Sequence, residues 1–381
     1  MNVSELKNAF ASHYGEDADA VMYAPGRVNL IGEHTDYNDG FVLPCAISFK
    51  NMIAYKKRND NLVRIVSVNY DNASDEFAVD KDIERSDQQW ANYVRGVAHI
   101  LKKGGHLLNG VDMMMYGDVP QGGGLSSSAA LEVCVGGVLN DVSELGLNPT
   151  EIALIGQASE NQFMGIQCGI MDQLISANGR ENRALLIDCE DVSFTPIPVP
   201  EDIAVVIVNS NYKRQLVGSE YNTRRRECEE AAQAVGVKSL RHATMAMLES
   251  HKDDMSELAF KRARHVITEN ERTEKAARAL RDNNFVELRA LINASHDSLR
   301  DDFEVTVPAT DGLVQICREA VGEDGAARMT GGGFGGCIVC LCKPEKVDAV
   351  LAAIGEKYEA QYNLVAQPYV CKADKGMHKI V

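Results

Sequence analysis

Residues 120–130, which read Pro-Gln-Gly-Gly-Gly-Leu-Ser-Ser-Ser-Ala-Ala, constrain the fold of this chain more than any other stretch. Each of the three adjacent glycines costs about 0.5–1 kcal/mol relative to alanine in regular structure, so we expect close backbone approach or positive φ there. The preceding residues 111–116 predict a strand. The helix formers of residues 129–139 predict a helix that begins within the serines, because serine is a preferred N-cap.

This order of strand, glycine loop and helix N-terminus predicts a binding site for an anion. Free backbone N–H groups at a helix N-terminus carry about half a positive charge. The hydroxyls of residues 126–128 can hold phosphate oxygens or a Mg²⁺ ion. A flexible turn is the alternative, and the stretch by itself does not decide between the two.

Charge and composition narrow the class of protein. The 381 residues allow two domains, and 45% hydrophobic with 25% charged residues is typical of a soluble globular protein. The net charge of −16 argues against a general nucleic-acid or anionic-membrane binder. No apolar run reaches the roughly 20 residues that span a bilayer, and residues 1–7 lack the pattern of a secretory signal. Ten scattered cysteines suit a reducing cytoplasm, so we expect a cytoplasmic protein.

Hydrophobic periodicity and turn residues predict a chain of mixed helices and strands. Strand patterns cover residues 21–31 (broken by Pro25-Gly26), 41–49, 52–55, 63–68, 184–188, 203–208 and a segment near 369. Helical patterns cover residues 4–14, 90–103, 220–235, 256–280, 285–299 and 346–362, and a further helix starts at Asn148 and carries Glu160 near its end. A polar, proline-containing stretch at 190–202 predicts a boundary between an N-terminal domain, 1–190, and a C-terminal domain, 191–381.

A second glycine segment, residues 331–336, formally matches the dinucleotide fingerprint GxGxxG. That fingerprint must follow a strand and open a helix, whereas these glycines lead into a strand-like run, 337–342. We therefore interpret the segment as a flexible loop at the edge of a ligand cleft. The run itself contains Cys337 and Cys340, which face opposite sides of a strand, so we interpret them as core residues rather than a metal pair.

Three further places carry residues suited to chemistry. The acidic loop, which we define as residues 33–36, reads Glu-His-Thr-Asp between glycines and is an exposed turn, a metal site or a site for a polyhydroxylated ligand. Arg27 lies in a largely apolar strand, so it needs a carboxylate partner or a functional anion. Asp172 is a charge among apolar residues, either a structural cap or ion pair or a base for a nucleophilic hydroxyl. These two would suit each other, but the sequence does not show contact.

Three motifs in family order resemble the galactokinase family. Residues 25–37, PGRVNLIGEHTDY, resemble its signature, and residues 122–129 and 329–336 resemble the second and third motifs of the superfamily of galactokinase, homoserine kinase, mevalonate kinase and phosphomevalonate kinase (GHMP). The resemblance implies a two-domain α+β GHMP-kinase fold, with mixed sheets covered by helices and the active site in the cleft between the domains. It also implies ATP-dependent phosphorylation of the C1 hydroxyl of α-D-galactose, the first committed step of galactose catabolism. Gly123 departs from the family, which more often has Ala or Ser there.

The same resemblance implies roles for individual residues. Asp172 would take the proton of the sugar hydroxyl, and Arg27 would stabilise the transferring phosphoryl group and keep Asp172 ionised. Ser128 and Glu160 would hold Mg²⁺, and Trp90 and Tyr93 would border the adenine. The sugar would be bound by Glu33, His34, Thr35, Asp36 and Tyr221. The ATP phosphates would be bound by Gly122, Gly123, Gly124, Leu125, Ser126, Ser127 and Ser128.

Two other functions remain open from the sequence. One is a kinase for a related sugar, such as N-acetylgalactosamine or arabinose. The other is a sensor that binds sugar and ATP without catalysis. Either way the expected partners are galactose or a related sugar and ATP, with no nucleic acid and no membrane, and the expected state is a monomer.

Overall fold

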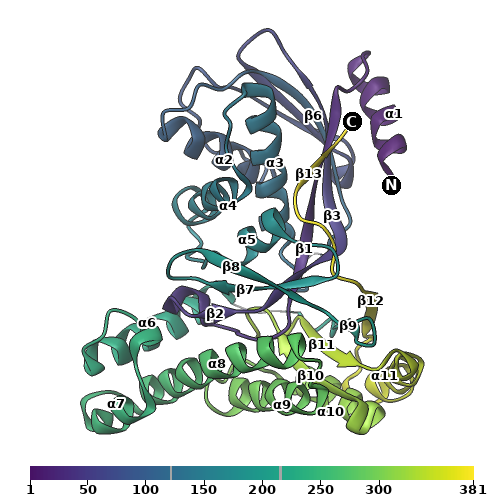
Figure 1. Cartoon of the computed structure of the whole chain (residues 1–381). Helices are drawn as coiled ribbons and strands as arrows, with labels where there is room; N and C mark the ends of the chain where they lie inside the picture. The colour runs from purple at the N-terminus through teal and green to yellow at the C-terminus, as the bar shows by residue number, and fades with distance from the viewer. Residues whose placement is uncertain (121, 214–216) are drawn as a thin grey trace.

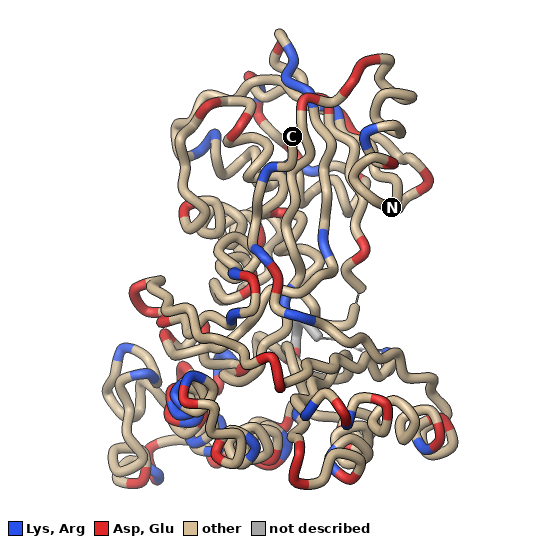
Figure 2. Tube along the Cα trace, turned by 45° about the vertical axis from the view of Figure 1, so that its right-hand side comes forward, with Lys and Arg blue, Asp and Glu red and all other residues tan. Residues whose placement is uncertain are grey.

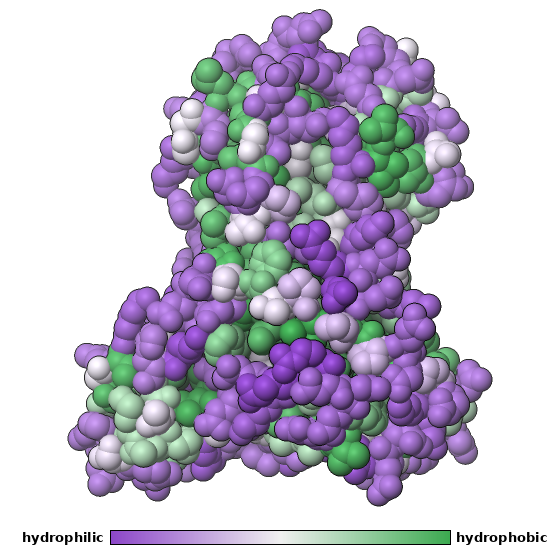
Figure 3. Space-filling model, in the orientation of Figure 1, coloured by the Kyte–Doolittle hydropathy of each residue, from purple (hydrophilic) through white to green (hydrophobic). Residues whose placement is uncertain are grey.

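The computed structural model describes residues 1–120, 122–213 and 217–381, so Gln121 of the glycine stretch lies outside the described residues. The described chain is a mixed α and β structure with three sheets. Figure 1 shows an upper body built on the largest sheet and a lower body of long helices, and Figure 3 shows that the molecule narrows between them. Acidic and basic residues are interspersed in both bodies (Figure 2).

The upper body is a six-stranded sheet in the order β13-β1-β3-β6-β4-β5. All of its pairings are antiparallel except that of β4 with β6. Its strands are β1 (Ala20–Asn29), β3 (Pro44–Lys57), β4 (Leu62–Ser67), β5 (Ala73–Ala78), β6 (Val111–Gly117) and β13 (His378–Ile380). One face is covered by α2 (Ala91–Lys103), α3 (Ser127–Ser143), α4 (Pro149–Ala158) and α5 (Met171–Asn178), and the other by α1 (Val3–Tyr14).

The lower body contains a four-stranded sheet in the order β10-β11-β9-β12. Its strands are β9 (Ala204–Asn209), β10 (Gly325–Thr330), β11 (Cys337–Cys342) and β12 (Gln367–Cys371). One face packs on α10 (Pro308–Val321) and α11 (Val347–Tyr362), and the other packs with residues of β1, α8 (Glu257–Arg281) and α9 (Phe285–Asp301). Beside them lie α6 (Val217–Val235) and α7 (Met245–Ser250). A small third sheet joins β2 (Phe41–Val42), β7 (Arg183–Asp188) and β8 (Ser193–Pro198).

Several predictions from the pattern are confirmed. The break at Pro25-Gly26 is a register shift in the pairing of β1 with β3. Cys337 and Cys340 belong to separate hydrophobic clusters on the two faces of β11, as alternation requires. Helix α3 begins at Ser127, within the predicted serines. Ser126 takes the N-cap position with φ 61° and makes no capping bond with its side chain, so its hydroxyl serves another partner.

In other places the structure differs from the pattern or adds an element that the pattern did not predict. The strands predicted at 41–49 and 52–55 are the short β2 and the continuous β3, which is buried over residues 44–47 and 52–55 and partly exposed between them. The stretch 190–202 contains strand β8. Its prolines are tolerated there because β8 is an edge strand of the three-stranded sheet. The division into residues 1–190 and 191–381 stays a prediction. The late strand β13 pairs with β1 in the upper sheet.

Within residues 1–120, 122–213 and 217–381, no helix combines the length and the apolar character that crossing a bilayer requires.

Candidate active site

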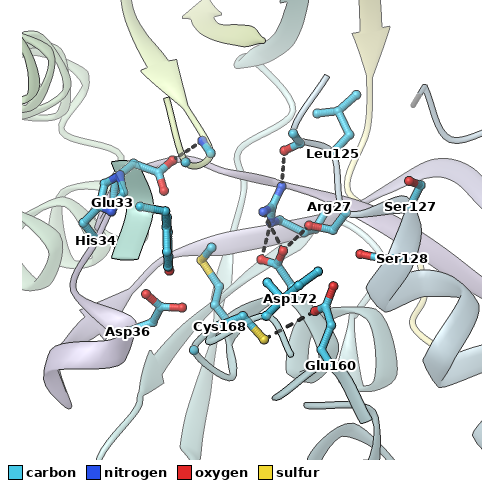
Figure 4. Close-up of a pocket in the computed structure, with 18 of the residues that line it drawn as sticks. Arg27, Glu33, His34, Asp36, Leu125, Ser127, Ser128, Glu160, Cys168 and Asp172 are labelled. Carbon is cyan, nitrogen blue, oxygen red and sulfur yellow. Dashed lines mark hydrogen bonds and ion pairs between the residues drawn. The ribbon is translucent and has the colours of Figure 1, made fainter. Parts of the chain in front are cut away.

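A cavity of about 370 Å³ lies where the glycine loop, the acidic loop and the second glycine segment meet. Of the residues that the sequence predicted for catalysis and for binding sugar, phosphate or metal, all line this cavity apart from Gly123 and Thr35. Figure 4 shows Arg27 and Asp172 in the middle, with Glu33, His34 and Asp36 on one side and Ser127 and Ser128 on the other. The structure therefore gathers residues from far apart in the chain around one ion pair.

The ion pair joins Arg27 of β1 to Asp172 of α5. Arg27 Nε lies 2.7 Å from Asp172 Oδ1, and Nη2 lies 2.8 Å from Oδ2, so the contact is bidentate. Arg27 is 4% exposed. Burial alone would lower the pKa of Arg27, but the contact with Asp172 and the negative charges of Asp172, Glu33 and Asp36 together raise that pKa above its ordinary value. The pair that the sequence only suggested is therefore present, and Asp172 is held in one orientation.

The glycine loop is fastened directly to this pair. Leu125 O accepts a hydrogen bond of 3.1 Å from Arg27 N, Gly124 O accepts one from Arg27 Nη1, and the Ser126 hydroxyl donates to Asp172 Oδ2. A Cβ atom at Gly26 would lie 2.7 Å from Leu125 O, so this approach needs glycine. The loop holds Gly122 and Gly124 at φ of 72° and 75°, conformations that side chains rarely adopt.

The N-terminus of α3 faces the cavity beyond this loop. Ser127 and Ser128 line both the main cavity and a neighbouring one of about 300 Å³. Trp90 and Tyr93 line the second cavity, and Tyr70 stacks on Trp90 with ring centroids 6.1 Å apart. A space with aromatic walls next to a helix N-terminus suits a ligand that has both a flat ring and phosphates. Gly123 lines neither cavity. A Cβ atom added to it would lie 3.1 Å from Cys337 Sγ.

Glu160 lies just after α4, in a π-helical turn that spans Ser159–Met164. Its Oε2 accepts hydrogen bonds from Gln173 Nε2 at 3.0 Å and from Cys168 Sγ at 3.3 Å. Burial, and then the negative charge of Asp172, raise the pKa of Glu160. A cation bound there would favour the ionised carboxylate.

The donor set around Glu160 fits one class of metal. The described part of the chain has no group of three or more His, Cys, Asp or Glu side chains that could hold an ion. A serine hydroxyl and one carboxylate, as in Ser128 and Glu160, suit Mg²⁺, which commonly takes one or two carboxylates and completes its shell with substrate phosphates and water. These residues therefore fit a metal that arrives with a phosphate ligand.

The acidic loop presents three side chains to the cavity. Glu33 Oε1 accepts hydrogen bonds from Gly331 N at 2.7 Å and Thr330 Oγ1 at 3.1 Å, which fastens the second glycine segment to the loop. His34 has φ 63°, and its Nδ1 lies 2.9 Å from the Tyr37 hydroxyl, while Nε2 has no hydrogen-bond partner among the described residues. Burial lowers the pKa of His34 to about 3, so this ring is neutral.

Asp36 and Tyr221 complete this side of the cavity. Burial, and then the charge of Asp172, raise the pKa of Asp36 to about 7. The Tyr221 ring lies 5.5 Å from the His34 ring and 5.3 Å from the Tyr37 ring, which gives the cavity an aromatic wall. Carboxylates beside an aromatic wall are suited to a ligand with several hydroxyls.

Thr35 is the member of the acidic loop that the structure turns away from the cavity. Its side chain is fully buried, and its hydroxyl donates to the carbonyls of Gly32 at 2.9 Å and Phe41 at 2.6 Å. This hydroxyl shapes the loop, so we leave Thr35 out of the ligand contacts proposed below.

Some residues of the site were missed by sequence reasoning. A Cβ atom at Gly169 would overlap the Asp36 carboxylate, so Gly169 makes room for it. Cys168 contacts Glu160, and Gln173 joins Glu160 to the buried Glu132 through bonds of 3.0 and 3.1 Å. Their one signal was proximity in sequence to Asp172. Gly331 and Gly332 do line the cavity, as the interpretation of the second glycine segment predicted.

Comparisons with known proteins agree with this geometry. Residues 8–57 match a family model described as the galactokinase galactose-binding signature, and residues 92–180 and 276–360 match the N-terminal and C-terminal GHMP kinase domains. A crystal structure of Lactococcus lactis galactokinase complexed with galactose is 36% identical over 99% of this chain and 100% of that chain, with a TM-score of 0.94.

More distant structures share the fold. The mevalonate kinase of Methanococcus jannaschii has a TM-score of 0.66 at 18% identity over 93% of this chain and 98% of that chain. The phosphomevalonate kinase of Streptococcus pneumoniae, solved with phosphomevalonate and AMPPNP, has a TM-score of 0.63 at 12% identity over 92% of this chain and 99% of that chain.

Proposed function

Because the chain belongs to the galactokinase family of GHMP kinases, it is a sugar kinase that phosphorylates galactose, and we propose that the cavity around Arg27 and Asp172 carries out the transfer from ATP to the C1 hydroxyl. The product is galactose 1-phosphate. The observation that carries this proposal is the position of the ion pair, with the acidic loop on one side and the glycine loop with the α3 N-terminus on the other (Figure 4).

We propose that Asp172 accepts the proton of the sugar hydroxyl as that oxygen attacks the terminal phosphorus of ATP. The bidentate contact with Arg27 aims this carboxylate, and the guanidinium is close enough to stabilise charge on the transferring group. Phosphoryl transfer needs mainly positioning and charge neutralisation. The backbone N–H groups of the glycine loop and of the first turn of α3, with Ser126, Ser127 and Ser128, supply further donors for the phosphates.

GHMP kinases use ATP with a divalent metal, and for this chain we propose Mg²⁺ held by Ser128 and Glu160. The ion would neutralise phosphate charge. We propose that Trp90 and Tyr93 border the adenine, since their cavity adjoins Ser127 and Ser128. We also propose that the protein acts as a monomer in the cytoplasm, the reducing compartment that suits ten cysteines.

On the sugar side, we propose that Glu33, His34, Asp36 and Tyr221 bind hydroxyls or a face of the sugar ring. Support comes from the unpartnered Nε2 of the neutral His34 and from Glu33, which lines the cavity while Oε1 is occupied by Gly331. A neutral imidazole can donate or accept, and an ionised carboxylate accepts from vicinal hydroxyls.

An ADP-release assay with a panel of sugars tests the function. The purified protein with ATP and Mg²⁺ is expected to release ADP with galactose, and much more slowly with N-acetylgalactosamine, arabinose or glucose. Product analysis by NMR is expected to place the phosphate on C1. Preference for another sugar would make the chain a kinase for that sugar. Galactose binding without ADP release would make it a sensor.

Galactose affinity is expected to fall as the pH is lowered through 7. The pKa of Asp36 is raised to about 7, so its carboxylate is ionised above that pH and protonated below it. If the ionised form accepts sugar hydrogen bonds, the galactose dissociation constant rises by up to about tenfold per pH unit below the pKa. Calorimetric titration from pH 6 to 8 without ATP measures this.

The control is the Asp36→Asn variant, whose galactose affinity is expected to be lower than that of the wild type at pH 8 and nearly constant over this pH range. Tighter binding of galactose by the wild type at pH 6 than at pH 8 would show that the protonated acid is the binding form.

A further inference from the structure

Helix α8 places a row of polar side chains behind the acidic loop, on the side away from the cavity. His265, Glu269 and Asn270 are all buried, and each contacts the backbone of residues 32–41. His265 Nε2 lies 3.1 Å from Glu33 O, and Asn270 Oδ1 accepts a bond of 2.9 Å from Phe41 N. Polar groups at such depth are costly unless they are paired, so their pairing with one loop indicates that α8 fixes its shape.

Glu269 makes the central contacts of this row and is fully buried. Its Oε1 accepts hydrogen bonds from Gly32 N at 3.0 Å, Glu33 N at 3.4 Å and Ser295 Oγ at 2.6 Å. Its Oε2 accepts a bond of 2.7 Å from Arg272 Nε. Burial opposes ionisation, but Arg272, His265 and Arg328, with the hydrogen bond from Ser295, together lower the pKa of Glu269 to about 2. A buried anion therefore holds the backbone immediately before His34.

The contacts continue from Glu269 to the cavity. Ser295 Oγ accepts a bond of 3.2 Å from Arg328 Nε, and Arg328 Nη1 lies 3.3 Å from Glu33 Oε1. Arg328 is fully buried and also donates to the carbonyls of Asn29 and Leu30, which lie at and just after the end of β1, before the acidic loop. Both the backbone and the side chain of Glu33 are thus tied to the same buried group of charges.

We propose that Glu269 is a positioning residue for the sugar: its carboxylate holds the Gly32 and Glu33 amides so that the side chains of the acidic loop point into the cavity. This inference rests on the proposed binding of galactose by that loop. Glu269 touches neither sugar nor ATP, because it does not line the cavity. Its loss is therefore expected to weaken galactose binding and leave ATP binding unchanged.

The Glu269→Gln variant tests this role through the chemistry of its neighbours. A glutamine amide has one acceptor oxygen and one donor NH₂ group. If the oxygen faces the Gly32 and Glu33 amides, the NH₂ meets the Arg272 Nε–H; if it faces Arg272, the NH₂ meets the loop amides. Either way two donors oppose each other. The galactose dissociation constant is expected to rise about tenfold or more, the effect of losing a hydrogen bond to a charged group.

A second substitution is expected to reverse the effect. In Glu269→Gln/Arg272→Met, the NH₂ group faces a methionine side chain and the oxygen is again available to the loop amides. Galactose affinity is therefore expected to return toward the wild-type value. The matched control is Glu271→Gln, which removes the same charge from the same helix at an exposed ion pair with Lys275. Its galactose affinity is expected to equal that of the wild type.

Calorimetry with galactose and, separately, with ATP and Mg²⁺ measures both affinities for the wild type, E269Q, the double variant and E271Q. The proposal is overturned if E269Q binds galactose like E271Q, if it loses ATP affinity to the same degree, or if the double variant shows no recovery. If E269Q does not fold, the double variant carries the test, and a folded double variant that binds ATP but not galactose overturns the proposal. Absence of galactose binding by the wild type would instead contradict the proposed function.

Discussion

Asp172→Asn is expected to lower kcat by about 10²–10⁴, the usual range for loss of a general base. The substitution keeps the shape of the side chain, and the amide oxygen can still accept from Arg27 or Ser126. What it removes is the capacity to take up a proton and the negative charge beside the sugar hydroxyl. ATP binding is expected to persist, because the glycine loop and the α3 N-terminus are unchanged. Single-turnover ADP release and calorimetry with ATP measure the two quantities.

The matched control is Asp301→Asn, which removes a carboxylate from a solvent-exposed pair with Arg300. Exposed pairs contribute little, so D301N is expected to keep wild-type turnover. If D172N also turned over at the wild-type rate, Asp172 would not be the base, and the transfer would proceed with the sugar hydroxyl only oriented by its neighbours.

Arg27→Met is expected to lower kcat by about 10³ or more, the range seen when an arginine that stabilises a transferring phosphoryl group is lost. Methionine keeps much of the length of the stem but removes both bonds to Asp172 and the bond to Gly124 O. It also leaves the Asp172 carboxylate without the guanidinium that orients it. ADP release with saturating galactose and ATP measures the loss.

The control for R27M is Arg281→Met, at an arginine on the surface that pairs with Asp282. The double variant R27M/D172N adds a sharper check. Residues that act as one unit lose activity together, so it is expected to be little slower than the slower of the two single variants. Losses that multiply in the double variant would show that Arg27 and Asp172 act independently.

Local chemistry singled out the two residues at the centre of this site without showing that they touch. A charged side chain among apolar residues needs a partner, which applies to both Arg27 and Asp172. In the structure these two side chains form an ion pair. The α3 start within the serines also follows from short-range preferences, although the Ser126 hydroxyl contacts Asp172 instead of capping the helix. The direction in which the Thr35 side chain points could not be predicted from the sequence. It is set by hydrogen bonds from its hydroxyl to two backbone carbonyls, which come together only in the folded loop.

Contacts over long sequence separations were beyond prediction. Glu269 lies in a helical pattern rich in charged residues, where a solvated face is the ordinary expectation, and only the folded chain brings it to Gly32. The need for glycine at position 169, which leaves space for Asp36, depends on packing between two segments far apart in the sequence. The extent of β3 depends likewise on its neighbours β1 and β6 rather than on its own residues.

Strand β13 has a consequence for the order in which this protein is built. Val21 pairs with Ile380, so the outer edge of β1 stays without this partner until residues 378–380, more than 350 positions further along, have been synthesised. During that time the edge offers unpaired backbone groups to other nascent chains, a known route to aggregation. Because β1 also carries Arg27, the docking of these three residues completes the sheet that holds this arginine.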